Sequence, residues 1–149
     1  MARYNKIYAG PVTETLPQVV EGPAATALTP GEIVTKTSNG KLTLHAVSGG
    51  GGAVLVVQEN YLAMKGVDVD IAADDVAIGI VPLDEQLLRV RVATANNVVI
   101  GSPLSSNGDG TVSIAATGEE VLFFAEEAYN NTSGSAQLVT VRKGKGVAA

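Results

Sequence analysis

The sequence predicts an all-β protein, either an antiparallel β-barrel or a β-sandwich, preceded by an extended N-terminal arm. Its composition favours strands and turns over helices, because the 149-residue chain combines 17 glycines and only 4 % aromatic residues with many Val, Ala and Thr residues. After Pro30, short runs of alternating apolar and polar residues are separated by turn signals about every eight to twelve residues. We divide the chain into an arm over residues 1–27 and a β domain over residues 28–149 with a short C-terminal tail.

The arm is predicted from its prolines. Four of the six fall within the first thirty residues, at positions 11, 17, 23 and 30. Each fixes φ and removes a backbone N–H donor, so the segment suits neither a helix nor a central strand. A frayed tail is the alternative, but the arm carries more apolar side chains than a solvated tail requires. We expect these side chains to anchor it on another protein: Ile7, Tyr8, Val12, Leu16, Val19 and Val20.

The first strands of the β domain are predicted from a tight turn. Residues 32–37 and 41–46 flank Asn39-Gly40, and an Asn-Gly pair adopts the positive φ angles that a two-residue hairpin needs. The glycine-rich run over residues 48–52 is expected to be a flexible connector. The apolar residues 53–58 after it predict a fully buried strand.

Two segments in the middle of the chain alternate strictly between apolar and charged residues, at positions 67–71 and 88–92. Both predict strands with one face in the core and the charged face in water. Short helical turns are expected near residues 61–65 and 84–88.

The last strands follow a second strong turn signal. Residues 107–110, Asn-Gly-Asp-Gly, lead into a predicted strand at 111–114. Residues 121–126 and 137–142 supply two more, joined across a polar loop at 130–135.

Charge and composition exclude several classes of protein. With 46 % hydrophobic and 17 % charged residues, the chain buries enough apolar surface to fold. It has no cysteine, which removes disulfide scaffolds and metal–thiolate sites. The longest clean apolar run, residues 53–57, is too short for a membrane span, and the N-terminus lacks an apolar signal core, so we expect synthesis in the cytosol and no membrane partner. A net charge of −5 disfavours direct binding to nucleic acid.

No motif for catalysis or cofactor binding stands out. His45 ends a predicted strand with no Ser or Cys partner nearby in the sequence, and we expect it at the surface or in a turn. The glycine-rich connector lacks the Gly-Lys-Ser/Thr of a phosphate-binding loop. We therefore predict a binding or structural protein without enzymatic activity, catalytic residues or cofactor.

A calcium site is the main alternative in the acidic middle of the chain. Seven acidic residues fall between positions 59 and 85, but their spacing lacks the glycine and the closing glutamate of an EF-hand loop. A solvated strand face accounts for Asp68 and Asp70 without a metal, and a turn accounts for Asp109. We predict no metal ligands.

The charges are unevenly placed along the chain. Arg3 and Lys6 lie near one end and Arg142, Lys143 and Lys145 near the other, on either side of the acidic middle. Surfaces of opposite sign could set the register between associating subunits. Ordinary solubility charges are the alternative.

Several short motifs resemble the head decoration, or cement, proteins of tailed bacteriophages. They are the Leu-Thr-Pro-Gly at residues 28–31, the Asn-Gly-Lys-Leu at 39–42 and the Gly-Ala-Val at 52–54. Further along, residues 97–104, the Asp-Gly-Thr-Val at 109–112 and residues 124–128 are similar to stretches common in the same group. The similarity touches about half of the chain, and residues 58–95 depart from the simplest family pattern.

The resemblance implies a β-tulip-like fold and a role in the virion. Such a protein assembles in the host cytoplasm, is often a homotrimer, and binds the major capsid protein on the outer surface of the head, where it stabilises contacts between capsid subunits. The arm would pair with capsid strands, and removing residues 1–24 would leave a folded domain that no longer binds. Two alternatives remain: a Ca²⁺- or carbohydrate-binding β-sandwich module, and a tail or baseplate component.

Overall fold

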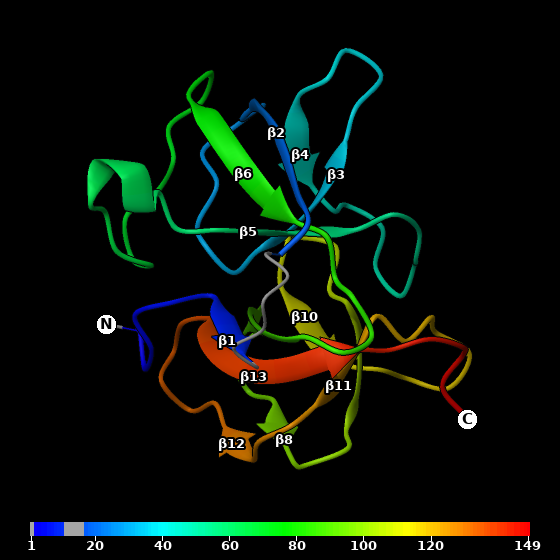
Figure 1. Cartoon of the computed structure of the whole chain (residues 1–149). Coiled ribbons are helices and arrows are strands. Elements are labelled where there is room, and N and C mark those ends of the chain that lie inside the picture. The colour runs from blue at the N-terminus through cyan, green and yellow to red at the C-terminus, as the bar shows by residue number, and fades with distance from the viewer. Residues whose placement is uncertain (1, 11–16) are drawn as a thin grey trace.

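The computed structural model of the chain describes residues 2–10 and 17–149, and it is all-β. In the described residues the only helical element is the single 3₁₀ turn η1 (Tyr61–Ala63), and no helix there is long and apolar enough to cross a membrane. The strands form two barrels, drawn one above the other in Figure 1. The predicted fold class is confirmed.

The first barrel contains five strands, each hydrogen-bonded to the next around the barrel. Their order is β2 (Val19–Pro23), β6 (Val76–Ile80), β5 (Leu55–Val57), β3 (Ile33–Lys36) and β4 (Leu42–Leu44). A single parallel bridge between Ala24 and Leu42 closes the ring, and the N–H of Ala25 donates to the carbonyl of Leu42 at 2.7 Å. The seam between β2 and β4 is therefore narrow.

The second barrel also closes on itself. Its strands follow the order β7 (Leu87–Val92), β10 (Val112–Ile114), β9 (Pro103–Ser106), β11 (Phe123–Ala125) and β13 (Gln137–Lys143). Strand β13 returns to β7 in an antiparallel ladder that runs from the Gln137–Val92 pair to the Arg142–Leu87 pair. Strand β1 (Tyr8–Gly10) lies beside β7, and β8 (Asn97–Val98) pairs with β12 (Tyr129–Asn130) at the far end.

Strands β3, β5 and β6 form a wall between the two hydrophobic cores. Successive side chains of a strand point to opposite faces, so Ile33 packs in the core of the second barrel while Val34 packs in the core of the first. The same alternation places Val56 on one side and Val57 on the other. Both faces of β5 are buried, so this strand is apolar throughout, and this explains the unbroken run that predicted it.

Most of the predicted strands and turns are confirmed. The Asn39-Gly40 hairpin joins β3 to β4 in register, with Thr35 opposite Thr43. The predicted strands at 111–114, 121–126 and 137–142 correspond to β10, β11 and β13, and the helical turn near residues 61–65 is η1.

The strand predicted at residues 67–71 is wrong. The N–H of Val69 bonds back to the carbonyl of Gly66 at 3.2 Å and closes a turn, and only Ile71 forms a bridge, with Leu28. The guanidinium of Arg91 donates a hydrogen bond to the carbonyl of Val67 at 2.7 Å, so a side chain and not a neighbouring strand holds this backbone.

Three other expectations in the middle of the chain are corrected. Strand β6 was not predicted, because Gly79 interrupts its apolar run. The strand at 88–92 is confirmed as part of β7, but Arg91 on its charged face is buried. Residues 84–85 form a turn, with the N–H of Gln86 bonded to the carbonyl of Leu83 at 3.2 Å, and no helical turn follows because Leu87 already starts β7.

The arm contributes strands to both barrels. Strand β1 lies beside β7 in the second barrel and β2 belongs to the first. Ala24 and Leu28, on either side of the predicted boundary at residue 27, are both fully buried in the core of the first barrel. Removing residues 1–24 would therefore take away two strands of the fold.

Candidate functional site

The residues predicted to anchor the arm lie in different environments. Ile7 is fully buried in the core of the second barrel, and Tyr8 packs beside it, partly buried. Val20 faces the core of the first barrel, while Val19 is 47 % exposed. Val12 and Leu16 lie outside the described residues. The role of these side chains in binding stays a prediction, and of the described ones Val19 offers the most free apolar surface.

Among the described residues, the outer edge of β2 has no strand beside it. Strand β2 ends the sheet order of the first barrel, and the bridge that closes the ring involves Ala24 and not the residues before it. Within residues 17–149 no strand pairs with the outer edge of Val19–Glu21. An unpaired strand edge presents backbone donors and acceptors to any extended segment that lies beside it.

A cluster of exposed apolar residues lies beside β6. We name Tyr61, Leu62, Met64 and Val76 the apolar knob; each exposes more than half of its surface, and Met64 exposes 95 %. Leu62 and Val76 line the same groove, of about 280 Å³, so the η1 turn lies close to β6. Exposed apolar clusters on a folded protein commonly mark interaction surfaces.

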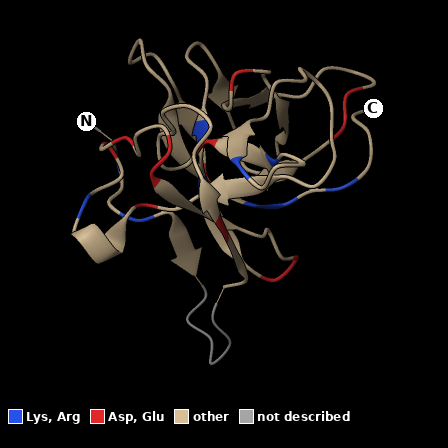
Figure 2. Cartoon of the chain, turned by 90° about the horizontal axis from the view of Figure 1, so that it is seen from above, with Lys and Arg blue, Asp and Glu red and all other residues tan. Residues whose placement is uncertain are grey.

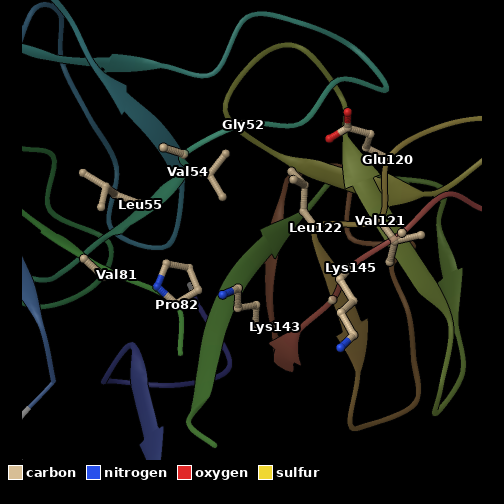
Figure 3. Close-up of a pocket in the computed structure, with 13 residues that line it drawn as sticks. Gly52, Val54, Leu55, Val81, Pro82, Glu120, Val121, Leu122, Lys143 and Lys145 are labelled. Carbon is tan, nitrogen blue, oxygen red and sulfur yellow. The ribbon is translucent and has the colours of Figure 1, made fainter. Parts of the chain in front are cut away.

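A cleft lies between the two barrels, and Figure 3 shows the side chains around it. It has a volume of about 490 Å³. One wall comes from the first barrel, through residues 52–55 and 81–82, and the other from the second, through residues 120–122 and 143–146. The walls are largely apolar, with the amines of Lys143 and Lys145 beside them (Figure 3).

The N-terminal residues form a clasp against the second barrel. We name Ala2–Ile7 the N-terminal clasp. The guanidinium of Arg3 stacks over the ring of Tyr129 at 3.8 Å, and that of Arg89 stacks over the ring of Tyr4 at 4.0 Å. The Tyr4 hydroxyl donates to the Glu127 carboxylate, which also accepts the N–H of Thr140 at 2.6 Å.

Two carboxylates of this region ionise more easily than usual. Burial disfavours the charged form of Glu127, but the hydrogen bonds from Tyr4 and Thr140 and the charge of Arg3 outweigh it, so its pKa is lowered. The backbone N–H of Ala2 donates to Asp68 at 2.7 Å and, with Arg91, lowers the pKa of that carboxyl. Glu127 and Asp68 therefore bind the N-terminal clasp as charged carboxylates.

The sequence predicted the single histidine at the surface or in a turn, and this prediction is wrong. His45 is 3 % exposed; its Nδ1 lies 2.7 Å from the Ser106 hydroxyl and its Nε2 lies 3.1 Å from the carbonyl of Gly51. The serine partner is 61 positions away, so a search for neighbours in the sequence missed it. The pair is buried, and it joins the segment that follows β4 to strand β9.

Two acidic residues of the middle segment bind separate partners. Asp70 accepts the Thr29 hydroxyl at 2.8 Å, and Asp74 pairs with Lys41 at 2.6 Å. In the described ranges no group of three His, Asp or Glu side chains is placed to hold a metal ion. Asp109 accepts the N–H and the hydroxyl of Thr111, at 2.9 and 2.6 Å, as expected for a turn. Figure 2 shows acidic and basic positions interspersed over the molecule, with basic residues along the segment that leads to the C-terminus.

Comparison with known proteins identifies a fold and no family. No protein-family model matches the sequence, and no curated protein matches it. Among solved structures, the fold is similar to that of the N base of the head fiber gp8.5 of bacteriophage phi29, with a TM-score of 0.58 and 14 % sequence identity. The match covers 90 % of this chain and 99 % of that one. The likeness therefore extends over both barrels.

Proposed function

We propose that this protein is a structural component of a tailed-phage head, a decoration or cement protein that binds the outer capsid surface. The observation that carries the proposal is the likeness to the N base of a head fiber over nearly the full length of both chains. The sequence motifs that resemble decoration proteins point the same way, and they lie at strands and turns of both barrels, such as Asn39-Gly40 and Asp109–Val112. The role is structural and not enzymatic.

The open edge of β2 is the proposed attachment site. A strand of the major capsid protein would add beside Val19–Glu21, and main-chain hydrogen bonds would supply the attachment. Val19 points away from the core of the first barrel and would contact the added strand. This keeps the binding role that the sequence predicted for the arm, but assigns it to a strand edge of the folded barrel.

Attachment to several capsid subunits at once would make weak contacts sufficient. A homotrimer presents three copies of the β2 edge, and linked contacts raise the overall affinity without stronger single contacts. Such a protein would clamp neighbouring capsid subunits and stabilise a filled head in the virion.

The test is binding to undecorated heads. Purified protein is mixed with heads that lack it, the heads are sedimented and imaged, and the bound fraction is measured. We expect Val19→Asp to reduce binding by about tenfold or more, because a buried charge at a contact is costly. The matched control is Val99→Asp, which changes a similarly exposed valine, 55 % against 47 %, on the other barrel.

The outcomes separate the parts of the proposal. If wild-type protein does not bind heads, the head role is wrong, and imaging of tails and baseplates tests the alternative component. If both variants bind like the wild type, the head role stands but the β2 edge is not the attachment site. Circular dichroism of each variant checks that the fold is intact.

A further inference from the structure

We propose that the cleft between the barrels receives the apolar knob of a second copy of this chain. The contact would join copies head to tail through two different surfaces. It goes beyond the capsid-binding role, because it assigns the surfaces through which copies contact each other and needs no capsid.

The cleft has the character of a receiving site. Three apolar residues of its walls are each less than 10 % exposed: Val121 and Leu122 on one side and Leu55 on the other. The walls are therefore held in place by packing against the rest of each barrel. Ala53 lies at the mouth and is exposed. A groove of about 490 Å³ between apolar walls has room for one or two large aliphatic side chains.

The knob is held outward by local hydrogen bonds. Met64 has a φ of +55°, a left-handed conformation that a non-glycine residue adopts at a cost. Its N–H bonds to the carbonyl of Tyr61 at 3.0 Å, and the side chain of Asn60 accepts the N–H of Ala63 at 3.2 Å. The turn therefore presents Leu62 and Met64 to solvent on a fixed backbone. A methionine on such a turn adapts its shape to a groove.

The charges around the two surfaces are complementary. The cleft carries Lys143 and Lys145 together with Glu120. The knob is flanked by Asp75, next to Val76, and by Lys65, next to Met64. Of the residues that the structure describes, Asp75, Lys65 and Lys145 join no ion pair within the chain. The acidic group beside the knob can therefore pair with a lysine of the cleft, and the basic group beside the knob can pair with Glu120. This favours a second copy of the chain over a partner whose surface carries charges of one sign only.

The placement of the two surfaces permits a repeated contact. The η1 turn is drawn at the left of Figure 1 and the C-terminal tail, which borders the cleft, at the right. One copy can therefore use both surfaces at the same time. Two different surfaces make a heterologous contact, and the rotation between copies decides whether it closes into a ring, such as a trimer, or continues as a row.

The experiment measures mass by light scattering and sedimentation, without heads. Wild-type protein is expected to associate as its concentration rises. Met64→Asp is expected to lower the association constant by about tenfold or more, because a charge cannot enter the apolar groove; aspartate also tolerates the left-handed conformation, so the turn should keep its shape. Ala53→Arg places a long charged side chain at the mouth of the cleft and should have the same effect.

A mixture of the two variants tests the head-to-tail arrangement. Met64→Asp keeps an intact cleft and Ala53→Arg keeps an intact knob, so an equal mixture should form dimers and nothing larger. Lys145→Glu should weaken association of the otherwise unchanged protein, and adding Asp75→Lys should restore it. Circular dichroism confirms the fold of each variant.

Three results would overturn the proposal. They are a wild-type protein that stays monomeric up to about 1 mM, variants that associate like the wild type, and a mixture that contains only monomers. A monomeric wild type would also remove the homotrimer from the proposed function, but binding to heads is measured directly, so head binding and self-association can fail separately.

Discussion

The two barrels close in different ways. The second is closed by the long ladder between β7 and β13, and the N-terminal clasp covers part of it. The first is closed by one bridge between Ala24 and Leu42, and no described strand pairs with the outer edge of Val19–Glu21. Both use five strands, so strand number does not account for the difference.

The difference separates two tasks. The ladder between β7 and β13 closes the second barrel over six residue pairs, whereas the first barrel is closed by a single bridge and keeps an edge that another strand can use. We therefore expect the second barrel to dominate stability and the first to carry the attachment site.

The largest effect is expected from removing residues 1–24. The deletion takes away β1, β2 and the buried side chains of Ile7 and Ala24, so both barrels lose a strand and part of a core. We expect no cooperative unfolding transition, measured by circular dichroism on heating. A truncated chain that still unfolds cooperatively would show that the arm is dispensable for folding, as the sequence alone suggested.

Truncation of one core side chain in each barrel tests which barrel dominates. Phe123→Ala in the second core and Leu42→Ala in the first remove fully buried side chains and should each cost about 2–5 kcal/mol. Phe123→Ala should lower the stability of the whole molecule. Leu42→Ala should mainly speed amide exchange in β2–β6 while β7 and β13 stay protected. Equal loss of protection in both barrels would contradict the division.

The seam of the first barrel can be strained by a single methyl group. A Cβ on Gly22 would lie 2.5 Å from the carbonyl oxygen of Gly40, so Gly22→Ala must push β2 away from the hairpin. We expect a loss of about 1–3 kcal/mol in chemical denaturation. Gly66→Ala is the matched control, because nothing lies within 4 Å of the added methyl, and its effect should be near zero. A similar loss of stability for both variants would mean that β2 and the hairpin move apart at little energetic cost.

The smallest effect is expected at the N-terminal clasp in acid. The lowered pKa of Glu127 means that the folded state favours the carboxylate, so its stabilising contribution is complete above the ordinary value of 4.5 and is lost as pH falls through the folded pKa. Glu127→Gln should therefore lose less stability than the wild type between pH 7 and pH 3, by about 1 kcal/mol or less. Parallel pH profiles would show that the clasp carboxylate does not contribute.

Local features of the fold could be predicted because their causes are local. Asn39-Gly40 and Asn107–Gly110 form the expected turns, since few residue pairs tolerate their backbone angles. Strand β5 was predicted because a strand buried on both faces is apolar throughout.

Features that depend on distant partners could not be predicted. Residues 67–71 alternate like a strand, but Arg91, 24 positions away, binds the carbonyl of Val67 and holds a turn instead. His45 is buried because Ser106 and Gly51 meet it there. Distant contacts likewise decide the burial of the residues predicted to anchor the arm: Ile7 lies in a core and Val19 lies at the surface.

The sequence by itself determined the fold class, the main turns and most of the strands, because alternation and turn chemistry act over a few residues. Only the tertiary structure decided how the sheets close, which edge stays open and which apolar residues remain exposed. Those properties depend on pairing between segments far apart in the chain: the single bridge of Ala24 to Leu42, the ladder of β7 with β13, and the meeting of both barrels at the cleft.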